Sequence, residues 1–225
     1  MIIAYNKPRK LCLFVPARSG TQYTSDVAEQ QDNAWITIDH LPTATEIANF
    51  SIDKSQIGEQ HHKFHDLMQE DITSYKHYFI YRDPVLRFIS ELCAFLYWDI
   101  PSDNATNTSQ LEQIKKLINI RIAEGNNHPR SHESNRLLSQ TTVVKPVLST
   151  LGINIKDVHR VDHQQLPILL DYNTELHKIA HGQWHGEIPN DPPPIDDGMT
   201  FKWFVSDEGI EYIKNLVKED YTTWN

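Results

Sequence analysis

The sequence predicts an α/β domain with a mainly parallel central sheet flanked by helices. Short β-rich runs alternate along the chain with amphipathic stretches, which is the order in which parallel strands and their crossover helices follow one another. The chain has 225 residues, 39% of them hydrophobic, which is enough for one substantial core. We therefore expect a single domain over residues 1–225.

Four β-rich runs are expected to form strands, and the first helix follows the first run. The runs are residues 11–15, 35–38, 78–81 and 158–161. The first helix should begin near Thr21, after a turn of Pro, Arg, Ser and Gly. The helix that follows Tyr81 has a clear predicted start, because Asp83 can cap it and Pro84 fits its first turn.

The later part of the chain reads as helices separated by loops. Helices are expected over residues 111–123, from Ser131 or Ser134 onward, and over residues 206–221, where Ser206 is the expected N-cap before two acidic residues. Residues 101–109, 125–130 and 188–199 contain many Pro, Gly, Asn, Asp and Ser residues and predict loops.

Composition argues against several classes of function. The formal charge of −9 makes broad nucleic-acid binding unexpected, because phosphate neutralisation needs many Lys and Arg on one face. No apolar run approaches the length of a membrane span and the N-terminus lacks an apolar signal region, so we expect a cytoplasmic protein without membrane contact. Cys12 and Cys93 lie in apolar runs and predict buried thiols. The twelve histidines form no recognisable ligand array, so no metal is expected.

The first motif is FVPARSGTQ, residues 14–22. An apolar strand runs into a turn and then a helix, which is the layout of a phosphate-binding loop. The sequence Arg-Ser-Gly-Thr at 18–21 supplies a cation, two hydroxyls, a flexible glycine and the amides of a helix start. The lysine of the nucleotide-hydrolase loop G-x-x-x-x-G-K-[ST] is missing. The alternative interpretation is a polar turn with an exposed arginine.

The second motif is YRDPVLRFIS, residues 81–90. Arg82 ends a predicted strand and Ser90 lies two turns into the following helix, so a guanidinium and a hydroxyl could converge on one phosphate group. Alternatively, Arg82 pairs with Asp83 or another acidic neighbour, and Ser90 is an ordinary residue of the helix surface.

Together the two motifs resemble the sulfotransferases that use 3′-phosphoadenosine 5′-phosphosulfate. Residues 18–21 resemble the 5′-phosphosulfate loop of that family, and R-D-P-x-x-R-x-x-S matches its 3′-phosphate motif, with the arginine and serine eight residues apart. Residues 40–47, HLPTATEI, are similar to the H-L-x-x-x-E-I stretch of carbohydrate-type and bacterial members, and the ending K-E-D-Y is also similar. The resemblance extends from about residue 10 to 222, although residues 100–155 are matched only by H-P-R-S-H.

The resemblance implies a fold like that of the P-loop NTPases, a co-substrate and a set of site residues. The implied contacts to the phosphosulfate donor are Arg18, Ser19, Gly20, Thr21, Gln22, Arg82 and Ser90. His40 would remove the acceptor proton, and Arg18 would stabilise charge on the departing phosphate, without a metal. Many members carry lysine where this chain has Arg18, and arginine keeps the charge but changes its geometry. Val85 and Leu86 also depart from the bacterial pattern.

Several assignments stay open at this level. His40 follows a predicted strand but could instead cap a helix or pack as a polar residue, His128 and His132 are alternative bases, and Glu46 either orients His40 or faces solvent. The resemblance implies a hydroxyl acceptor, a small molecule or a glycan, with a carbohydrate or a small alcohol expected and a peptide tyrosine still open; the net negative charge of the chain argues against a polyanionic glycan. Candidate platforms for adenine are Tyr23, Trp35, Trp184 and Trp203, and Arg160 contacts the nucleotide or pairs with Asp157 or Asp162.

Two other classes of function are compatible with the loop. One is a P-loop-type phosphotransferase, against which the absence of lysine after Gly20 and of a clear second acidic motif for a metal both count. The other is a catalytically silent module that binds an anion or a nucleotide. Comparing stabilisation by adenosine 3′,5′-bisphosphate with stabilisation by ATP and magnesium separates these classes.

Overall fold

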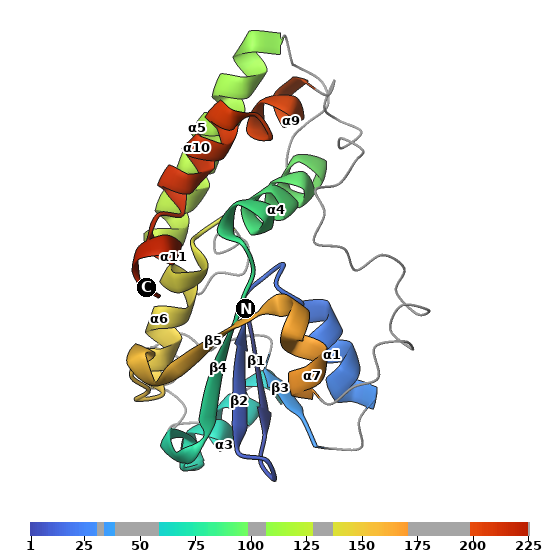
Figure 1. Cartoon of the computed structure of the whole chain (residues 1–225), viewed down its shortest axis with the longest axis vertical. Helices are drawn as coiled ribbons and strands as arrows, with labels where there is room; N and C mark the ends of the chain where they lie inside the picture. The colour runs from blue at the N-terminus through green and yellow to red at the C-terminus, as the bar shows by residue number, and fades with distance from the viewer. Residues whose placement is uncertain (31–33, 39–58, 99–106, 128–136, 171–198, 225) are drawn as a thin grey trace. The chain divides into compact units, whose positions relative to one another are not determined.

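The computed structural model describes residues 1–30, 34–38, 59–98, 107–127, 137–170 and 199–224 (Figure 1). The chain divides into two compact units. The first comprises Met1–Tyr81 and Val143–Gly182, and the second comprises Arg82–Thr142 and Gln183–Asn225. In the described residues, the first unit contains a sheet with helices and the second is helical.

The first unit is an α/β structure built on a mixed sheet. Among the described residues, this sheet has five strands in the order β3-β1-β2-β4-β5. They are β1 (Ile2–Asn6), β2 (Leu11–Val15), β3 (Ile36–Ile38), β4 (Lys76–Tyr81) and β5 (Val158–Asp162). β2 pairs in parallel with β4, and β4 with β5, whereas β1 pairs antiparallel with both β2 and β3. The α/β class is confirmed, and the expectation of a mainly parallel sheet is wrong.

The antiparallel pairings come from β1, which the sequence analysis did not identify. Residues 7–10 turn the chain directly back into β2, so Asn6 pairs with Leu11 in a hairpin. The Asn6 side chain supports this turn by accepting a hydrogen bond from Arg9 N at 3.0 Å. A connection this short can join only antiparallel neighbours. All residues of β1 and β2 are buried, so β1 lacks the alternation of polar and apolar residues that signals a half-exposed strand.

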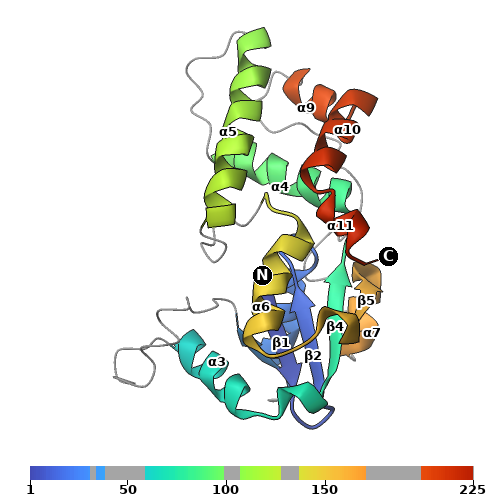
Figure 2. The ribbon, with the colours of Figure 1, turned by 90° about the vertical axis from the view of Figure 1, so that its left-hand side faces the viewer.

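Helices cover both faces of this sheet (Figures 1 and 2). On one face, α1 (Thr21–Gln30) and α7 (Leu166–Leu170) pack against alternate strand residues such as Leu13 and Val15. On the other lie α3 (Glu59–Gln69) and the part of α6 (Gln140–Thr150) that belongs to this unit. Short 3-10 turns at Ile72–Ser74, Ile155–Asp157 and His163–Gln165 connect these elements.

The second unit has a hydrophobic core of its own between helices. Its helices are α4 (Pro84–Trp98), α5 (Asn107–Asn127), the first turn of α6, α9 (Met199–Phe204), α10 (Asp207–Leu216) and α11 (Glu219–Thr222). The buried core residues are Val85, Phe88, Ile89, Leu92, Ile114, Ile118, Leu137, Phe204, Ile213 and Val217. The apolar face of α4 therefore packs in this core.

Most of the predicted helix starts agree with the structure. α1 begins at Thr21, and Asp83 caps α4 by accepting a hydrogen bond from Leu86 N at 2.9 Å. Ser206 caps α10 by accepting one from Gly209 N at 3.3 Å. The expected helix over 206–221 is interrupted, because α10 ends at Leu216 and α11 begins at Glu219. The proposed starts at Ser131 and Ser134 lie outside the described residues, and α6 begins at Gln140.

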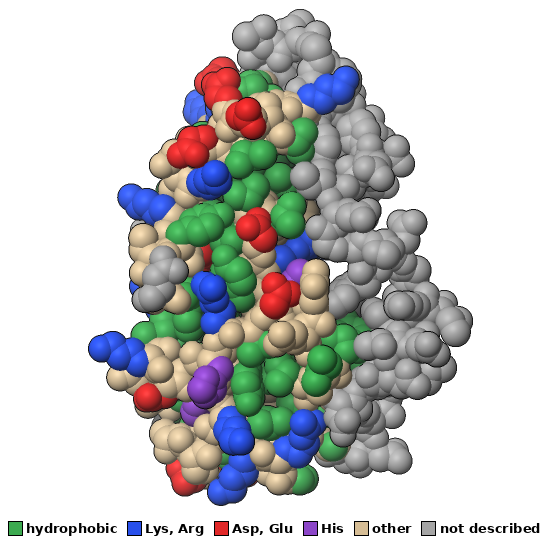
Figure 3. All heavy atoms as spheres, in the orientation of Figure 1, with side chains coloured by type: hydrophobic (Ala, Val, Ile, Leu, Met, Phe, Trp, Pro, Cys, Tyr) green, Lys and Arg blue, Asp and Glu red, His purple; other side chains and the backbone are tan. Residues whose placement is uncertain are grey.

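Surface charge, helix length and the environment of Cys12 can be described for the residues that the structure covers. On the face shown in Figure 3, Lys and Arg side chains of the described residues are scattered among acidic ones. None of the helices in the described ranges is both long and apolar enough to cross a membrane. Cys12 is fully buried, and burial raises the pKa of its thiol. The Cys93 side chain lies outside the described part of the chain.

We predict that His77 makes the stability of the first unit depend on pH. His77 is buried, and its Nε2 lies 2.9 Å from the carbonyl oxygen of Ile72. Burial lowers the pKa of His77, and His159 adds to this shift, whereas the Ile72 carbonyl and Asp157 oppose it. The folded state therefore binds fewer protons than the unfolded state. The stabilisation is complete above the ordinary pKa near 6.5 and is lost as pH falls from there through the folded value.

Urea unfolding between pH 5 and pH 7.5 measures this effect. The free energy of unfolding should fall on acidification by up to ~1.4 kcal/mol for each unit by which the pKa is lowered. His77→Gln keeps a hydrogen-bond donor but removes the titration, so its profile should be flatter than that of the wild type. Parallel profiles for the two proteins would contradict the assignment.

Candidate functional site

The loop between β2 and α1 has a tightly turned backbone. Ser19 N donates to the carbonyl oxygen of Pro16 at 3.1 Å, which closes the turn directly after the buried strand. Arg18 has φ +61° and Gly20 has φ +103°, both in the left-handed region. Glycine tolerates that region, whereas a residue with a Cβ pays about 1–2 kcal/mol to enter it. Arg18 therefore holds a strained conformation, and its side chain is exposed.

The start of α1 follows this turn immediately. Its first helical hydrogen bond runs from Thr24 N to Gly20 O at 2.9 Å, and the Thr24 hydroxyl donates to the same oxygen at 2.8 Å. The amides of Thr21 and Gln22 precede that bond, in the first turn, where helix amides can serve an anion. Ser19 is fully buried and its amide serves the turn, while Gly20 and Thr21 are half-buried. The side chain of Gln22 lies outside the described residues.

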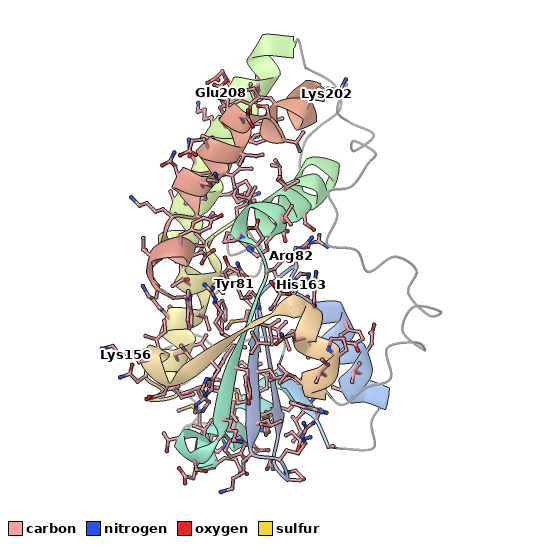
Figure 4. All side chains as sticks on the ribbon, in the orientation of Figure 1. Tyr81, Arg82, Lys156, His163, Lys202 and Glu208 are labelled. Carbon is pink, nitrogen blue, oxygen red and sulfur yellow. The ribbon has the colours of Figure 1, made fainter. Side chains whose placement is uncertain are left out.

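Arg82 lies between the end of β4 and the start of α4 (Figure 4). Both polar groups of its backbone are bound by one side chain, that of the fully buried Gln140. Arg82 N donates to Gln140 Oε1 at 3.2 Å, and Gln140 Nε2 donates to Arg82 O at 2.8 Å. This pairing imitates the double hydrogen bond of two strands and fixes the backbone from which the Arg82 guanidinium extends. The Arg82 side chain is half-buried.

Gln140 is itself fixed by the amino end of α6. The fully buried carboxylate of Asp220 accepts from Gln140 N at 2.9 Å and from Thr141 N at 2.7 Å, and Ser139 Oγ accepts from Thr142 N at 3.0 Å. Three successive amides of the helix start are thus satisfied by protein groups, and the negative charge lies at the positive end of the helix dipole.

Two further contacts strengthen this arrangement. Trp224 Nε1 donates to Thr141 Oγ1 at 2.8 Å, and Thr142 Oγ1 donates to the Glu219 carboxylate. Both partners belong to the end of the described chain, so this end holds the first turn of α6. Sequence analysis identified neither Gln140 nor Asp220. Ser139 followed by Gln-Thr-Thr is a recognisable N-cap, but nothing local indicates that Asp220 completes it from 80 residues away.

Arg87, the second arginine of R-D-P-x-x-R-x-x-S, is only 1% exposed. Its Nη2 donates to the carbonyl oxygen of Leu138, two residues before Gln140. Burial lowers the pKa of this guanidinium, while the negative charges of Asp220 and Glu91 oppose the shift. A buried cation needs such partners. Arg87 therefore ties α4 to the segment before α6 and is not exposed to a ligand.

Some of the remaining predicted site residues are described in the structure, and others lie outside the described ranges. Ser90 lies on α4 and is half-buried, two turns after the start of the helix at Pro84. Asp83 Oδ1 serves the helix cap. His40, the predicted base, lies outside the described residues, as do Glu46, His128 and His132; β3 ends at Ile38, two residues before His40.

The aromatic candidates for adenine binding have different environments. Tyr23 and Trp35 are 2% and 4% exposed and belong to the core of the first unit, so neither presents an open ring. Trp203 carries the ammonium of Lys115 4.0 Å from its ring centroid. Trp184 lies outside the described residues.

Tyr81, the last residue of β4, and Arg160, in the middle of β5, form a contact in the first unit. The Arg160 guanidinium carbon lies 4.5 Å from the ring centroid of Tyr81, which Figure 4 labels at the end of β4. Among the described residues, Arg160 therefore makes a cation–π contact and not the expected ion pair with Asp157 or Asp162.

The described residues contain no group of three or more His, Cys, Asp or Glu side chains placed to hold a metal ion. Comparisons of the chain with models of protein families, with curated proteins and with solved structures found no match.

We predict that the loop tolerates glycine at position 18 but not a side chain at position 20. Arg18→Gly removes about 1–2 kcal/mol of left-handed strain and adds about 0.5–1 kcal/mol of glycine entropy cost, so the free energy of unfolding should be unchanged or slightly higher. Gly20→Ala should lower it by at least ~1 kcal/mol. Urea unfolding measures both changes.

Gly152→Ala is the matched control for this comparison. Gly152 has φ +68°, and a Cβ there meets nothing within 4 Å, so this variant measures the backbone cost alone. A marked loss of stability in Arg18→Gly would show that the Arg18 side chain supports the fold, and would contradict its interpretation as a strained residue held for a ligand.

Proposed function

We propose that the chain is a sulfotransferase that moves a sulfuryl group from 3′-phosphoadenosine 5′-phosphosulfate to a hydroxyl acceptor, either a carbohydrate or a small alcohol. The loop after β2 carries this proposal. It combines a buried parallel strand, a turn with Arg18 and Gly20 in left-handed conformations, and a helix that begins at Thr21. Among the described residues, the other non-glycine residue with a positive φ is Lys10 in the β1–β2 turn; strain of this kind is found in tight turns and is concentrated at ligand sites.

The chemistry needs a cation and amide donors near the departing phosphate. Arg18 and the first amides of α1 supply these groups, and the exposure of the Arg18 side chain supports that role. During transfer, the acceptor oxygen forms a bond to sulfur while the bond from sulfur to the bridging phosphate oxygen breaks. The acceptor proton passes to a base, which we assign to His40, and adenosine 3′,5′-bisphosphate leaves.

The 3′-phosphate is assigned to Arg82 and Ser90. The sequence resemblance motivates this assignment, and the paired backbone of Arg82 supports it, because a fixed backbone reduces the entropy lost when a side chain binds its ligand. Under the same proposal, the α/β unit is a variant of the P-loop NTPase-like fold with β1 inserted as an antiparallel strand.

Thermal stabilisation distinguishes this proposal from its rivals. A ligand at one hundred times its dissociation constant stabilises the folded state by about 2.7 kcal/mol. Adenosine 3′,5′-bisphosphate should therefore raise the melting temperature, whereas ATP with magnesium should raise it less. A preference for ATP would favour a phosphotransferase, and no response to either ligand would favour a silent module.

Arginine substitution tests the phosphate contacts. Arg82→Ala should weaken binding of adenosine 3′,5′-bisphosphate by roughly 10- to 100-fold, because a hydrogen bond to a charged group contributes about 1.5–3 kcal/mol. Isothermal titration measures this change. Arg9→Ala is the control, since Arg9 lies in the turn before β2, at the opposite end of that strand from Arg18. Equal losses in the two variants would indicate a general charge effect and contradict the assignment.

Substitution of His40 tests the base. His40→Ala should abolish sulfuryl transfer from the radiolabelled donor to an acceptor while leaving the affinity for adenosine 3′,5′-bisphosphate largely unchanged. Unchanged turnover would place the base at another residue.

A further inference from the structure

We infer that Gln140 is a positioning residue for Arg82 and that Asp220, through Gln140, sets the direction in which the Arg82 guanidinium is presented. This inference rests on the proposed function, because it concerns the 3′-phosphate contact assigned to Arg82. It adds two residues from distant parts of the chain to that contact, and neither of them would touch the nucleotide.

The first step is the double hydrogen bond between Gln140 and Arg82. The amide oxygen of Gln140 accepts from Arg82 N at 3.2 Å, and the amide nitrogen donates to Arg82 O at 2.8 Å. Arg82 directly follows the last residue of β4, so at this position the chain leaves the sheet. Gln140 supplies the backbone pairing that the next residue of a strand would have supplied. Both backbone dihedral angles of Arg82 are thereby restrained.

The second step is the immobility of Gln140 itself. Gln140 is fully buried, and its own amide is bound at 2.9 Å by Asp220, which is also fully buried. The Asp220 carboxylate cannot move without leaving two amides of α6 unpaired, and its negative charge interacts favourably with the buried guanidinium of Arg87.

The third step is the match between this restraint and the task of an arginine that binds phosphate. A guanidinium recognises phosphate through paired N–H groups in a fixed plane, so its strength depends on direction. The hydrogen bonds of a guanidinium to a charged phosphate weaken steeply when their direction is wrong, so misdirecting the group can lose up to the ~10- to 100-fold in affinity that its removal would lose. A residue that fixes the arginine backbone therefore contributes to affinity without contacting the ligand.

The test compares Gln140→Leu with Thr142→Val. Gln140→Leu keeps side-chain volume but removes both hydrogen bonds to Arg82. Thr142 lies in the same helical turn as Gln140, and its hydroxyl donates to Glu219 but makes no hydrogen bond to Arg82. Thr142→Val therefore controls for damage to the start of α6. The ligands are adenosine 3′,5′-bisphosphate and adenosine 5′-monophosphate, which differ in the 3′-phosphate.

Gln140→Leu should weaken binding of the bisphosphate by roughly 10-fold and by no more than Arg82→Ala does, with little change for the monophosphate. Thr142→Val should change neither. In an Arg82→Ala background, Gln140→Leu should have no further effect on the bisphosphate, because Gln140 acts through Arg82. Equal bisphosphate affinity in Gln140→Leu and the wild type would overturn the inference, as would additive losses in the double variant.

Hydrogen exchange at the Arg82 amide separates failure of the inference from failure of the proposed function. This amide should exchange slowly in the wild type and in Thr142→Val, and quickly in Gln140→Leu. If the wild type does not bind adenosine 3′,5′-bisphosphate, the proposed function fails, and the inferred role of Gln140 in phosphate binding fails with it. This holds even if slow exchange shows that Gln140 restrains the Arg82 backbone. Unaltered exchange in Gln140→Leu would overturn the positioning alone. Should Gln140→Leu fail to fold, Gln140→Glu serves instead, because it keeps the acceptor for Arg82 N and loses the donor to Arg82 O.

Discussion

The second unit depends on a buried carboxylate at the amino end of a helix. Asp220 satisfies two amides of α6, and its negative charge opposes the lowering of the Arg87 pKa that burial causes. Removing one member of such a group would leave an uncompensated polar atom or charge inside the protein, which costs more than the interaction itself contributes. The hydrogen bond from Arg87 to Leu138 and the pairing of Gln140 with Arg82 follow from this arrangement, because both require the start of α6 to stay in place.

The starts of α6 and α1 therefore differ in their capacity to bind a ligand. The carboxylate of Asp220 already accepts hydrogen bonds from two amides at the positive end of α6, so these amides are not available to another anion. The start of α1 follows a turn in which Arg18 is exposed and strained. An anion that binds there would contact helix amides and a guanidinium together, whereas at α6 the protein already supplies the anion. Because of this contrast, the functional proposal rests on the loop between β2 and α1 and not on the start of α6.

Local sequence signals predicted the elements that depend on neighbouring residues. The strand at 11–15, the helix start at Thr21 and the caps at Asp83 and Ser206 each need only a few consecutive residues, and all of them are found. The antiparallel strand β1 was missed because its run IIAYN contains Ala4 and Asn6, residue types that are depleted in strands. Asp220 and Gln140 were missed because their roles arise from hydrogen bonds between residues about 60 to 80 positions apart, which no local pattern reveals.

The β1–β2 hairpin also affects the order in which the first unit assembles. β2 gains a partner across a four-residue turn, whereas its pairing with β4 must wait for the chain to close over residues 16–75. Closing a short loop loses less chain entropy, so the hairpin is expected to form early and to present β2 as a template for β4. The antiparallel strand β1 thus gives this mixed sheet one pairing between neighbouring segments, whereas its other pairings connect distant ones. The loop that carries Arg18 would therefore follow a strand that is already paired early in folding.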